Sequence, residues 1–357
     1  MKGIILGGGR GTRLRPLTHT GPKQLIPVAN RPVIEYAVED LREAGVTEIA
    51  IVLGNKGREE IQSHLGDGSA YGVDITYVVQ GNPLGIAHAV GCCRDFVGDD
   101  DCVVYLGDNV LKRGIAELVG SFEAGDYVAG IALQPVENPG RFGVADVDEA
   151  GRVRSLVEKP EDPPSDLALV GVYVFSPAVF EDVEAIEPSW RDELEITDAI
   201  QWLLEERGAI DSHVVDGWWK DTGEPEDIID ANRLLLEDIE RTVSGTVEDG
   251  AEVSGRIDLH EGARVEAGAV VRGPASIASG TVLEAGTYVG PYTSIGPDSR
   301  LVGAHVENSV VVGESTIATA ERFVDSLIGR GATVRSADGR LPSGNRLVVG
   351  ENSQLEL

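Results

Sequence analysis

The sequence predicts an α/β domain with a mainly parallel sheet, followed by a parallel β-helix. In the first hundred residues, short apolar runs alternate with stretches whose apolar residues have helical spacing. This alternation is typical of a parallel sheet that helices cover on both faces. In the last third of the chain, aliphatic residues recur every six positions, and that period is typical of a β-helix built from hexapeptides.

The α/β portion begins with a predicted strand over residues 3–6. Alternating helices and strands are then predicted over residues 32–44, 49–53, 58–65, 75–79, 86–96 and 102–106. Past residue 126 the segments are strand-like, at 127–133, 142–147, 153–157 and 169–175, with a hairpin at 148–151. Two helices follow at 195–207 and 225–241. We expect residues 1–240 to form one domain with an inserted, partly antiparallel portion.

The six-residue repeat predicts the second domain, over residues 245–357. Its ten regular positions are Val247, Val253, Leu259, Val265, Val271, Ile277, Leu283, Val289, Ile295 and Leu301. Helices and ordinary strands repeat at 3.6 and 2 residues and have no reason to keep this period. The register becomes irregular after about residue 305, where Phe323, Leu327, Ile328 and Val334 are expected to continue or cap the solenoid.

The composition limits the possible partners. The chain carries 60 acidic against 30 basic residues, a net charge of -30, which argues against binding nucleic acid. Only six of the basic residues are lysine. An acid-rich, lysine-poor surface is expected of a halophilic protein, because salt screens its self-repulsion.

The sequence predicts a cytoplasmic protein with no membrane partner. The glycine loop begins at residue 7, too early for the apolar part of a signal peptide, and no apolar run is long enough to span a membrane. Cys92, Cys93 and Cys102 form no C-x-x-C pair, so we expect reduced cysteines in the core or on a helix.

A cationic glycine loop follows the first strand. The glycines are Gly7, Gly8, Gly9 and Gly11, and the cations that follow are Arg10, Arg13, Arg15 and Lys23, with no acid before Glu35. Such a loop favours a polyphosphate, although a glycine-rich turn with solvated arginines is the alternative. Thr12 breaks the dinucleotide fingerprint and Gln24 breaks the P-loop pattern.

The compound pattern L-G-G-G-x-G-T-R-L-x-P, with P-K-Q-L-x-P-V about ten residues on, resembles the signature of the sugar-1-phosphate nucleotidylyltransferases. Within that family, the chain resembles the long form of glucose-1-phosphate thymidylyltransferase. This resemblance implies a Rossmann-like sheet of the nucleotide-diphospho-sugar transferase type and a left-handed β-helix. Residues 346–353 also resemble that form.

The resemblance implies transfer of a nucleotidyl group from dTTP or UTP to glucose 1-phosphate, with release of pyrophosphate. Arg13 and Lys23 match the signature cations, with Arg15 in support. Catalysis would depend on orientation and on neutralising phosphate charge. The full nucleotide-binding set implied is Leu6, Gly8, Gly9, Gly11, Thr12, Arg13, Arg15, Gln80, Pro83 and Gly85.

The family's two metal motifs are similar to residues 107–109 and 217–223, so Asp108, also a catalytic candidate, and Asp221 are expected to hold Mg²⁺. An Asp directly after a strand can instead be a helix N-cap. The second carboxylate favours the metal site.

The sugar phosphate would be bound by residues from several further motifs. Glu158 and Lys159 match the family's E-K-P, in which the acid takes sugar hydroxyls and the lysine the phosphate, although the pair could also be a solvated turn. Trp219 is expected to stack near the sugar or to lie in the core. The implied set is Asn109, Gly143, Glu158, Lys159, Val170, Gly171, Tyr173, Arg191 and Trp219.

Residues 80–89 resemble the family's base-binding segment. The amide of Gln80 can both donate to and accept from a pyrimidine edge, and Gly8 and Gly85 would let the ring lie against backbone. Gln24 after Lys23 is more similar to the thymidylyl and uridylyl branches than to the guanylyl branch. His88 is expected to be a helix surface residue.

Three alternatives stay open at this stage. The enzyme could be specific for UTP. The β-helix could add an N-acetyltransferase activity, for which only His260 and His305 follow residue 220 as candidate bases. The chain could also be a catalytically silent regulatory relative. Because a hexapeptide coil presents flat faces, we expect a homo-oligomer, with a trimer as our hypothesis.

Overall fold

The computed structural model describes residues 1–149, 151–336 and 352–354. The chain forms two compact units, the first from Met1–Arg10 and Val33–Asp221, the second from Gly11–Pro32 and Thr222–Leu357. These units divide the chain elsewhere than the predicted domains 1–240 and 245–357, since residues 11–32 and 222–240 pack with the solenoid. Residues 346–351 of the closing stretch lie outside the described residues.

The first unit is built on one mixed sheet. Its main path runs β10-β9-β11-β6-β1-β4-β5; off this path, β8 pairs with β11, and β12 pairs with β8. β6, β1, β4 and β5 are parallel, whereas β11 runs antiparallel to β6, β8 and β9. The strands are β1 (Lys2–Leu6), β4 (Glu48–Leu53), β5 (Asp74–Val79), β6 (Cys102–Leu106), β8 (Ala129–Pro135), β9 (Gly143–Val147), β10 (Val153–Glu158), β11 (Leu167–Phe175) and β12 (Ile210–Val214).

The predicted hairpin after residue 147 is confirmed. β9 and β10 pair antiparallel, with Val147 opposite Val153. The N–H of Gly151 donates to the carbonyl of Asp148 at 2.9 Å, and the N–H of Arg152 donates to the Asp148 side chain at 3.0 Å. The Asp148 side chain thus accepts from the N–H of Arg152, which has no partner in the strand pairing. Aspartate commonly does this in turns.

Seven helices are described in the first unit: α1 (Val33–Glu43), α2 (Arg58–Leu65), α3 (Ile86–Gly91), α4 (Arg94–Val97), α5 (Ala116–Ala124), α6 (Val179–Ala185) and α7 (Ile196–Glu206). The single helix predicted over residues 86–96 is two helices. The N–H of Cys93 donates to the carbonyl of Val90 at 2.9 Å, a three-residue step that tightens the last turn of α3 and ends it.

All three cysteines are free, as predicted. Cys93 and Cys102 are buried, and Cys92 is partly exposed at the end of α3. Burial raises the pKa of Cys93 to about 12, so this thiol stays protonated and unreactive at neutral pH.

In the second unit, the solenoid strands form three parallel sheets, as expected for a left-handed parallel β-helix. The first sheet has β14 (Thr242–Val243), β17 (Ile257–Leu259), β20 (Ala275–Ile277), β23 (Thr293–Ile295), β26 (Val310–Val311) and β29 (Leu327–Ile328). The second has β15 (Thr246–Val247), β18 (Arg264–Val265), β21 (Val282–Leu283), β24 (Arg300–Val302), β27 (Thr316–Ala318) and β30 (Thr333–Arg335). The third has β16 (Glu252–Ser254), β19 (Val270–Arg272), β22 (Tyr288–Val289), β25 (His305–Glu307) and β28 (Arg322–Val324).

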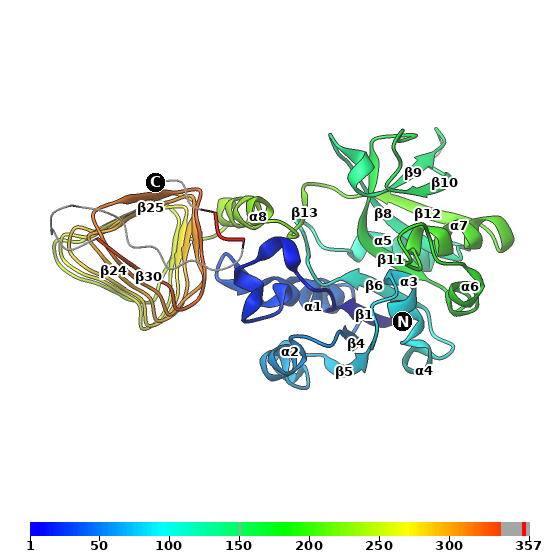
Figure 1. Cartoon of the computed structure of the whole chain (residues 1–357), viewed down its shortest axis with the longest axis horizontal. Helices are drawn as coiled ribbons and strands as arrows, with labels where there is room; N and C mark the ends of the chain where they lie inside the picture. The colour runs from blue at the N-terminus through cyan, green and yellow to red at the C-terminus, as the bar shows by residue number, and fades with distance from the viewer. Residues whose placement is uncertain (150, 337–351, 355–357) are drawn as a thin grey trace. The chain divides into compact units, whose positions relative to one another are not determined.

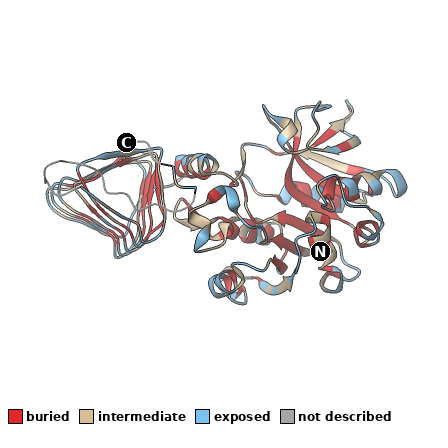
Figure 2. Cartoon of the chain, in the orientation of Figure 1, coloured by how far each residue is buried: buried red, intermediate tan, exposed pale blue. Residues whose placement is uncertain are grey.

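The six-residue repeat forms the solenoid core, visible as the red inner strips of Figure 2. From Leu259 to Leu301, the side chains at the predicted positions are fully buried. Val247 and Val253 are more exposed because they belong to the first coil, which has no coil before it. Phe323, Ile328 and Val334 pack against the core and so continue the solenoid.

Helix α8 (Pro225–Glu237) and the short hairpin of β2 (Pro27–Val28) and β3 (Arg31–Pro32) complete the second unit. Glu224 and Asp227 form a capping box at the start of α8, which satisfies N–H groups that the first turn leaves open. Across both units, none of the described helices has the length and apolar character that crossing a membrane requires.

Candidate active site

Two loops leave the same edge of the sheet in the first unit. β1 and β6 are parallel neighbours, with Leu6 opposite Leu106 (Figure 1). The glycine loop after Leu6 and the turn at Gly107 and Asp108 therefore both begin at strand carboxyl ends. The N–H of Gly107 also donates to the carbonyl of Leu6 at 3.1 Å. Open α/β sheets bind ligands at such an edge, so it is the candidate site.

A two-stranded sheet brings Asp221 to the turn that contains Asp108. β7 (Asn109–Leu111) pairs antiparallel with β13 (Trp219–Asp221), and Asp221 lies opposite Asn109. Residues directly opposite in such a pair have Cα atoms about 4.5–5.5 Å apart. Since Asp108 precedes Asn109, two aspartates far apart in the sequence occupy neighbouring backbone positions.

This pair of carboxylates suits Mg²⁺. Mg²⁺ is usually held by one or two carboxylates, with substrate phosphates and water completing its octahedron. In the described part of the chain, no group of three or more His, Cys, Asp or Glu side chains is placed to hold a metal by itself. An ion held by Asp108 and Asp221 would therefore need further oxygen ligands from substrate and solvent.

Asn109 and Trp219 are joined across the same two strands. The indole Nε1 of Trp219 donates to Oδ1 of Asn109 at 2.8 Å, and Asn109 is buried. The Phe142 ring meets the Trp219 ring edge-on, with centroids 5.1 Å apart. Gly171 has φ of 77°, and a Cβ there would lie 2.7 Å from Nδ2 of Asn109. Glycine at position 171 is therefore required for Asn109 to take this place.

The predicted sugar-phosphate residues Glu158, Lys159 and Arg191 form one charged cluster. Nζ of Lys159 lies 3.2 Å and Nη1 of Arg191 lies 3.5 Å from Oε1 of Glu158. Arg191 is also 3.2 Å from Glu195, and Thr197 Oγ1 donates to Glu158 at 3.4 Å. The cluster offers two cations and a hydroxyl-binding carboxylate, which together suit a phosphorylated sugar.

Sequence reasoning did not assign Glu195 and Thr197, although both belong to the segment that starts at Arg191. Glu195 is nearly fully buried, and its pKa is raised, mainly by that burial. Lys159 has a backbone φ of 41°, an uncommon conformation for a residue with a side chain. Backbone strain of this kind is often found at binding sites.

Gln80 is held by the start of the following helix. Its Nε2 donates to the carbonyl of Gly85 at 3.0 Å and lies 3.1 Å from Nδ1 of His88. Oε1 faces the glycine loop, 3.7 Å from where a Cβ on Gly8 would lie. His88 was predicted to be a helix surface residue and is partly exposed on α3, where it also contacts this amide. Because Nε2 is bonded to Gly85 and His88, Gln80 can offer a nucleobase its acceptor oxygen, Oε1.

The signature cations belong to the second unit. Thr12 and Arg13 lie in a 3₁₀ turn (Thr12–Leu14), and Lys23 begins another (Lys23–Leu25). Gly11 has φ of 57°, and a Cβ there would lie 3.3 Å from Cβ of Lys23. The Thr18 hydroxyl donates to the carbonyl of Gly11 at 2.6 Å. Gly11 thus lets the two cationic turns fold against each other.

Arg13 forms an ion pair with Glu224, Nη1 to Oε1 at 3.6 Å. The Arg13 side chain is 66% exposed, so solvent weakens this pair and a phosphate can compete for the guanidinium.

Four residues that were predicted to contact a ligand have no side chain or free space exposed for that contact. The side chains of Leu6, Val170 and Tyr173 are buried, so any contact with a ligand would use their backbone. The space beside Gly143 is taken by protein, because a Cβ there would lie 2.7 Å from Cγ2 of Thr197.

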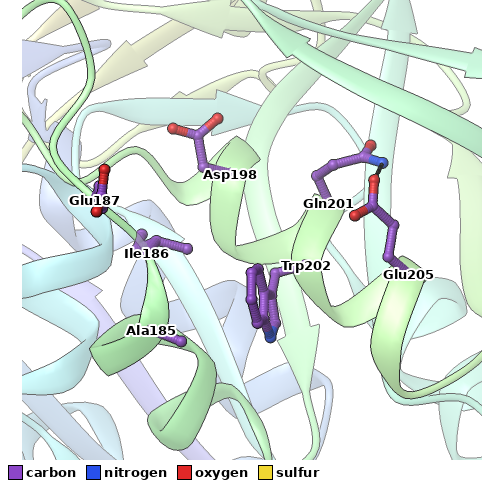
Figure 3. A pocket seen from close by; sticks show the side chains of 7 residues that line it. All are labelled: Ala185, Ile186, Glu187, Asp198, Gln201, Trp202 and Glu205. Atoms are coloured by element: carbon purple, nitrogen blue, oxygen red, sulfur yellow. Dashed lines mark hydrogen bonds between the residues drawn. The ribbon is translucent and has the colours of Figure 1, made fainter.

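A separate depression of about 390 Å³ lies beside α7 (Figure 3). Trp202 forms its apolar wall, and Gln201 donates to Glu205 at its rim. Glu187, Asp198 and Glu205 line it, and its lining includes no basic side chain. Burial raises the pKa of Asp198. An acidic lining repels phosphates, so this depression does not fit a phosphorylated substrate.

A glycine loop at the carboxyl edge of parallel strands, with two aspartates and a charged cluster in the same unit, is the arrangement expected of a nucleotidyltransferase. The chain belongs to the nucleotidyl transferase family, whose match covers residues 2–238. It is an enzyme of the kind that transfers nucleotidyl groups to sugar phosphates.

Several relatives match the whole chain, and two of them show the range of similarity. It is 71% identical over 357 residues, 100% of both chains, to the low-salt glycan biosynthesis nucleotidyltransferase Agl11 of Haloferax volcanii. It is 47% identical over 358 residues, 100% of this chain and 99% of the relative, to the glucose-1-phosphate thymidylyltransferase of Streptomyces antibioticus. A solved UDP-glucose pyrophosphorylase with UDP-glucose is 28% identical with a TM-score of 0.60, covering 66% of this chain and 98% of that one.

Proposed function

We propose that this enzyme transfers the nucleotidyl group of dTTP, or UTP, to glucose 1-phosphate and releases pyrophosphate. The products are dTDP-glucose or UDP-glucose. The observation that carries the proposal is the β7–β13 pairing, which puts Asp221 opposite Asn109 and next to Asp108. The full-length similarity to a glucose-1-phosphate thymidylyltransferase supports this choice of sugar and nucleotide.

The reaction brings two phosphorylated partners together, so the protein has to neutralise and orient them. We assign Arg13 and Lys23 to the triphosphate, with Arg15 in support, and Asp108 and Asp221 to Mg²⁺. When bound, Mg²⁺ would neutralise phosphate charge and stabilise the pyrophosphate that leaves. The chain itself needs no covalent nucleophile, because in-line attack by the sugar phosphate oxygen completes the transfer.

The sugar phosphate is assigned to the charged cluster of the first unit. Lys159 and Arg191 would bind its phosphate, and the Glu158 carboxylate would accept hydrogen bonds from sugar hydroxyls. Trp219 is held by Asn109 and Phe142, and the carbonyl of Phe142 accepts from the N–H of Lys159 at 3.0 Å. An indole fixed in this way can give the sugar ring an apolar face.

Thymine and uracil both carry an N3–H donor, and we assign its recognition to Oε1 of Gln80. Removal of the His88 acceptor by His88→Ala frees the Gln80 amide to rotate. A hydrogen bond of this kind contributes about 0.5–1.5 kcal/mol. We therefore expect the KM for dTTP to rise by about two- to tenfold, with kcat at saturating nucleotide nearly unchanged, in steady-state pyrophosphate-release assays.

His88→Asn serves as the rescue variant, because its side-chain oxygen can accept from Gln80 near the position of Nδ1. It should recover most of the affinity. His64→Ala is the matched control, since His64 lies on another helix, α2, where its ring is 2.6 Å from Glu35. An unchanged KM in His88→Ala would contradict the role of His88.

The proposed function is tested by pyrophosphate release over a grid of dTTP, UTP, ATP and GTP against the 1-phosphates of glucose, galactose, mannose and N-acetylglucosamine. Each pair is run with and without Mg²⁺. We expect the highest kcat/KM for dTTP with glucose 1-phosphate and no release without the metal. One methyl group separates dTTP from UTP, worth about 1–3 kcal/mol, so UTP should be used more slowly. Highest activity with ATP or GTP would overturn the proposal.

The alternatives predicted from the sequence receive less support. The candidate base His260 lies 2.8 Å from Asp258, whereas His305 meets the Tyr288 ring edge-on. A histidine–carboxylate pair or a ring contact does not by itself identify an acetyl-transfer site. Adding acetyl-CoA and glucosamine 1-phosphate should give no acetylated product. The signature cations and both aspartates are present, which disfavours a silent regulatory relative.

We also propose that the protein forms a homo-oligomer through the β-helix, with a trimer as the starting hypothesis, and that it works in the cytoplasm at high salt. The acid-rich composition supports the last point. Light scattering at low and high KCl tests both the assembly and its dependence on salt.

A further inference from the structure

The end of the signature segment, defined as residues 11–32, is bound to the solenoid. Nδ2 of Asn30 donates to the carbonyl and hydroxyl of Ser276, at 3.0 and 2.9 Å, and lies 3.2 Å from the carbonyl of Ile295. Ser276 and Ile295 belong to β20 and β23, two neighbouring strands of one solenoid sheet. One side chain of the segment thus bridges two coils.

Asn232 of α8 makes a second link between the same parts. Its Oδ1 accepts from the N–H of Ala29 at 2.9 Å and from the hydroxyl of Ser294 at 2.6 Å. Its Nδ2 donates to the carbonyl of Tyr292 at 2.9 Å. Two donors meet the oxygen and a carbonyl meets the nitrogen, so only one orientation of the amide satisfies all three partners. Asn232 is completely buried, where losing such bonds is costly.

Helix α8 lies against the solenoid in Figure 1, and further contacts fix it there. The Arg233 guanidinium lies 5.2 Å from the centre of the Tyr292 ring, and the Tyr292 hydroxyl donates to Glu237 at 3.2 Å. Together with Asn232, these residues hold α8 against the solenoid, where Asn232 contacts Ala29.

The signature segment has little regular structure of its own. It consists of 3₁₀ turns and a hairpin of two-residue strands. Ala29 and Asn30 have φ of 48° and 62°, a region that costs free energy for residues with a side chain. Contacts outside the segment must therefore hold its conformation, and the links to α8 and the solenoid do so.

We propose that Asn232 is a positioning residue for nucleotidyl transfer, and that the solenoid holds the segment that carries Arg13 and Lys23 through Asn232 and Asn30. This inference rests on the proposed function of those two cations. It gives the β-helix an indirect part in catalysis, through the signature segment, besides any part in assembly. A misplaced cation reduces stabilisation of the transition state more than substrate binding, so the effect should fall on kcat.

The test compares Asn232→Ala with Thr287→Val in the full-length protein. Thr287 is also buried, but its hydroxyl donates to the carbonyl of Leu301 and accepts from the N–H of Gly303, both within the solenoid. Asn232→Ala should lower kcat at least about tenfold at temperatures where circular dichroism shows a folded protein, with the KM for the sugar phosphate changed less than twofold. Thr287→Val should lower the Tm but keep kcat. Ser294→Ala, which removes one of the three bonds, should give an intermediate kcat.

Hydrogen exchange of residues 11–32 is the second readout and needs no substrate. Exchange there should become faster in Asn232→Ala and stay as in the wild type in Thr287→Val. The inference is wrong if kcat falls in both variants in proportion to the fall in their Tm. It is also wrong if hydrogen exchange of residues 11–32 is unchanged in Asn232→Ala. If wild-type protein releases no pyrophosphate with any substrate pair, the proposed function fails instead, and hydrogen exchange still decides whether Asn232 anchors the segment.

Discussion

Asp221→Asn is expected to lower the turnover by about a hundred- to a thousandfold and to raise the Mg²⁺ concentration needed for half-maximal rate. The substitution keeps the size of the side chain but removes the negative charge that the metal requires. Loss of one group that stabilises developing charge typically costs about 2.7–4 kcal/mol. Pyrophosphate release measured over a MgCl₂ series gives both quantities.

Asp216→Asn is the matched control for this prediction. Asp216 lies in the same stretch of chain but pairs with Arg113 on the surface, and both side chains are more than 60% exposed. Its loss should leave the turnover and the Mg²⁺ dependence unchanged. If Asp221→Asn responds to MgCl₂ as the wild type does, Asp108 and Asp221 do not hold the metal together. Asp221 is the residue opposite Asn109, so the substitution leaves no carboxylate at that position.

The solenoid could be predicted almost completely because its order is local. Each inward side chain, such as Ile277 or Leu283, contacts mainly the equivalent positions of the coils before and after it. A period in the sequence therefore becomes a period in space. The exceptions, Val247 and Val253, lie where the stack ends and an inward position is no longer covered.

The α/β unit was predicted less completely. Its buried parallel strands are apolar runs, and a motif placed after such a run falls at the carboxyl edge of the sheet. Helix α5 was missed because its buried residues, Leu118, Val119 and Phe122, form a short stripe interrupted by Gly120. The extent of antiparallel pairing around β11 was also not predicted. A strand that is buried on both faces is an apolar run whether it pairs parallel or antiparallel, so its sequence does not show the direction.

The candidate site shows the limit of sequence reasoning most clearly. Motifs identified Asp108, Asp221 and Lys159, but not the contacts that hold them. The bond between Trp219 and Asn109 joins residues 110 positions apart, and that between Asn232 and Ala29 spans 203. No periodicity encodes such pairs. They depend on how strands and coils pack, so supporting residues are found only in the structure.

Lys23→Ala is expected to lower turnover by at least about a hundredfold with little change in the Tm. The ammonium group is assigned to the charge that shifts at the α-phosphoryl group, and removing one such donor costs roughly 3–4 kcal/mol. The substitution keeps the Cβ of residue 23, the atom that packs close to Gly11. Lys56→Ala is the control, because Lys56 is exposed and lies outside every motif.

Lys23→Arg should recover only part of the rate, since a planar guanidinium cannot reproduce a compact point charge. Single-turnover measurements with saturating dTTP and glucose 1-phosphate separate a slower chemical step from weaker binding. Near-normal single-turnover rates in Lys23→Ala would leave Arg13 as the cation that matters, and Arg13→Ala would then have to show the loss.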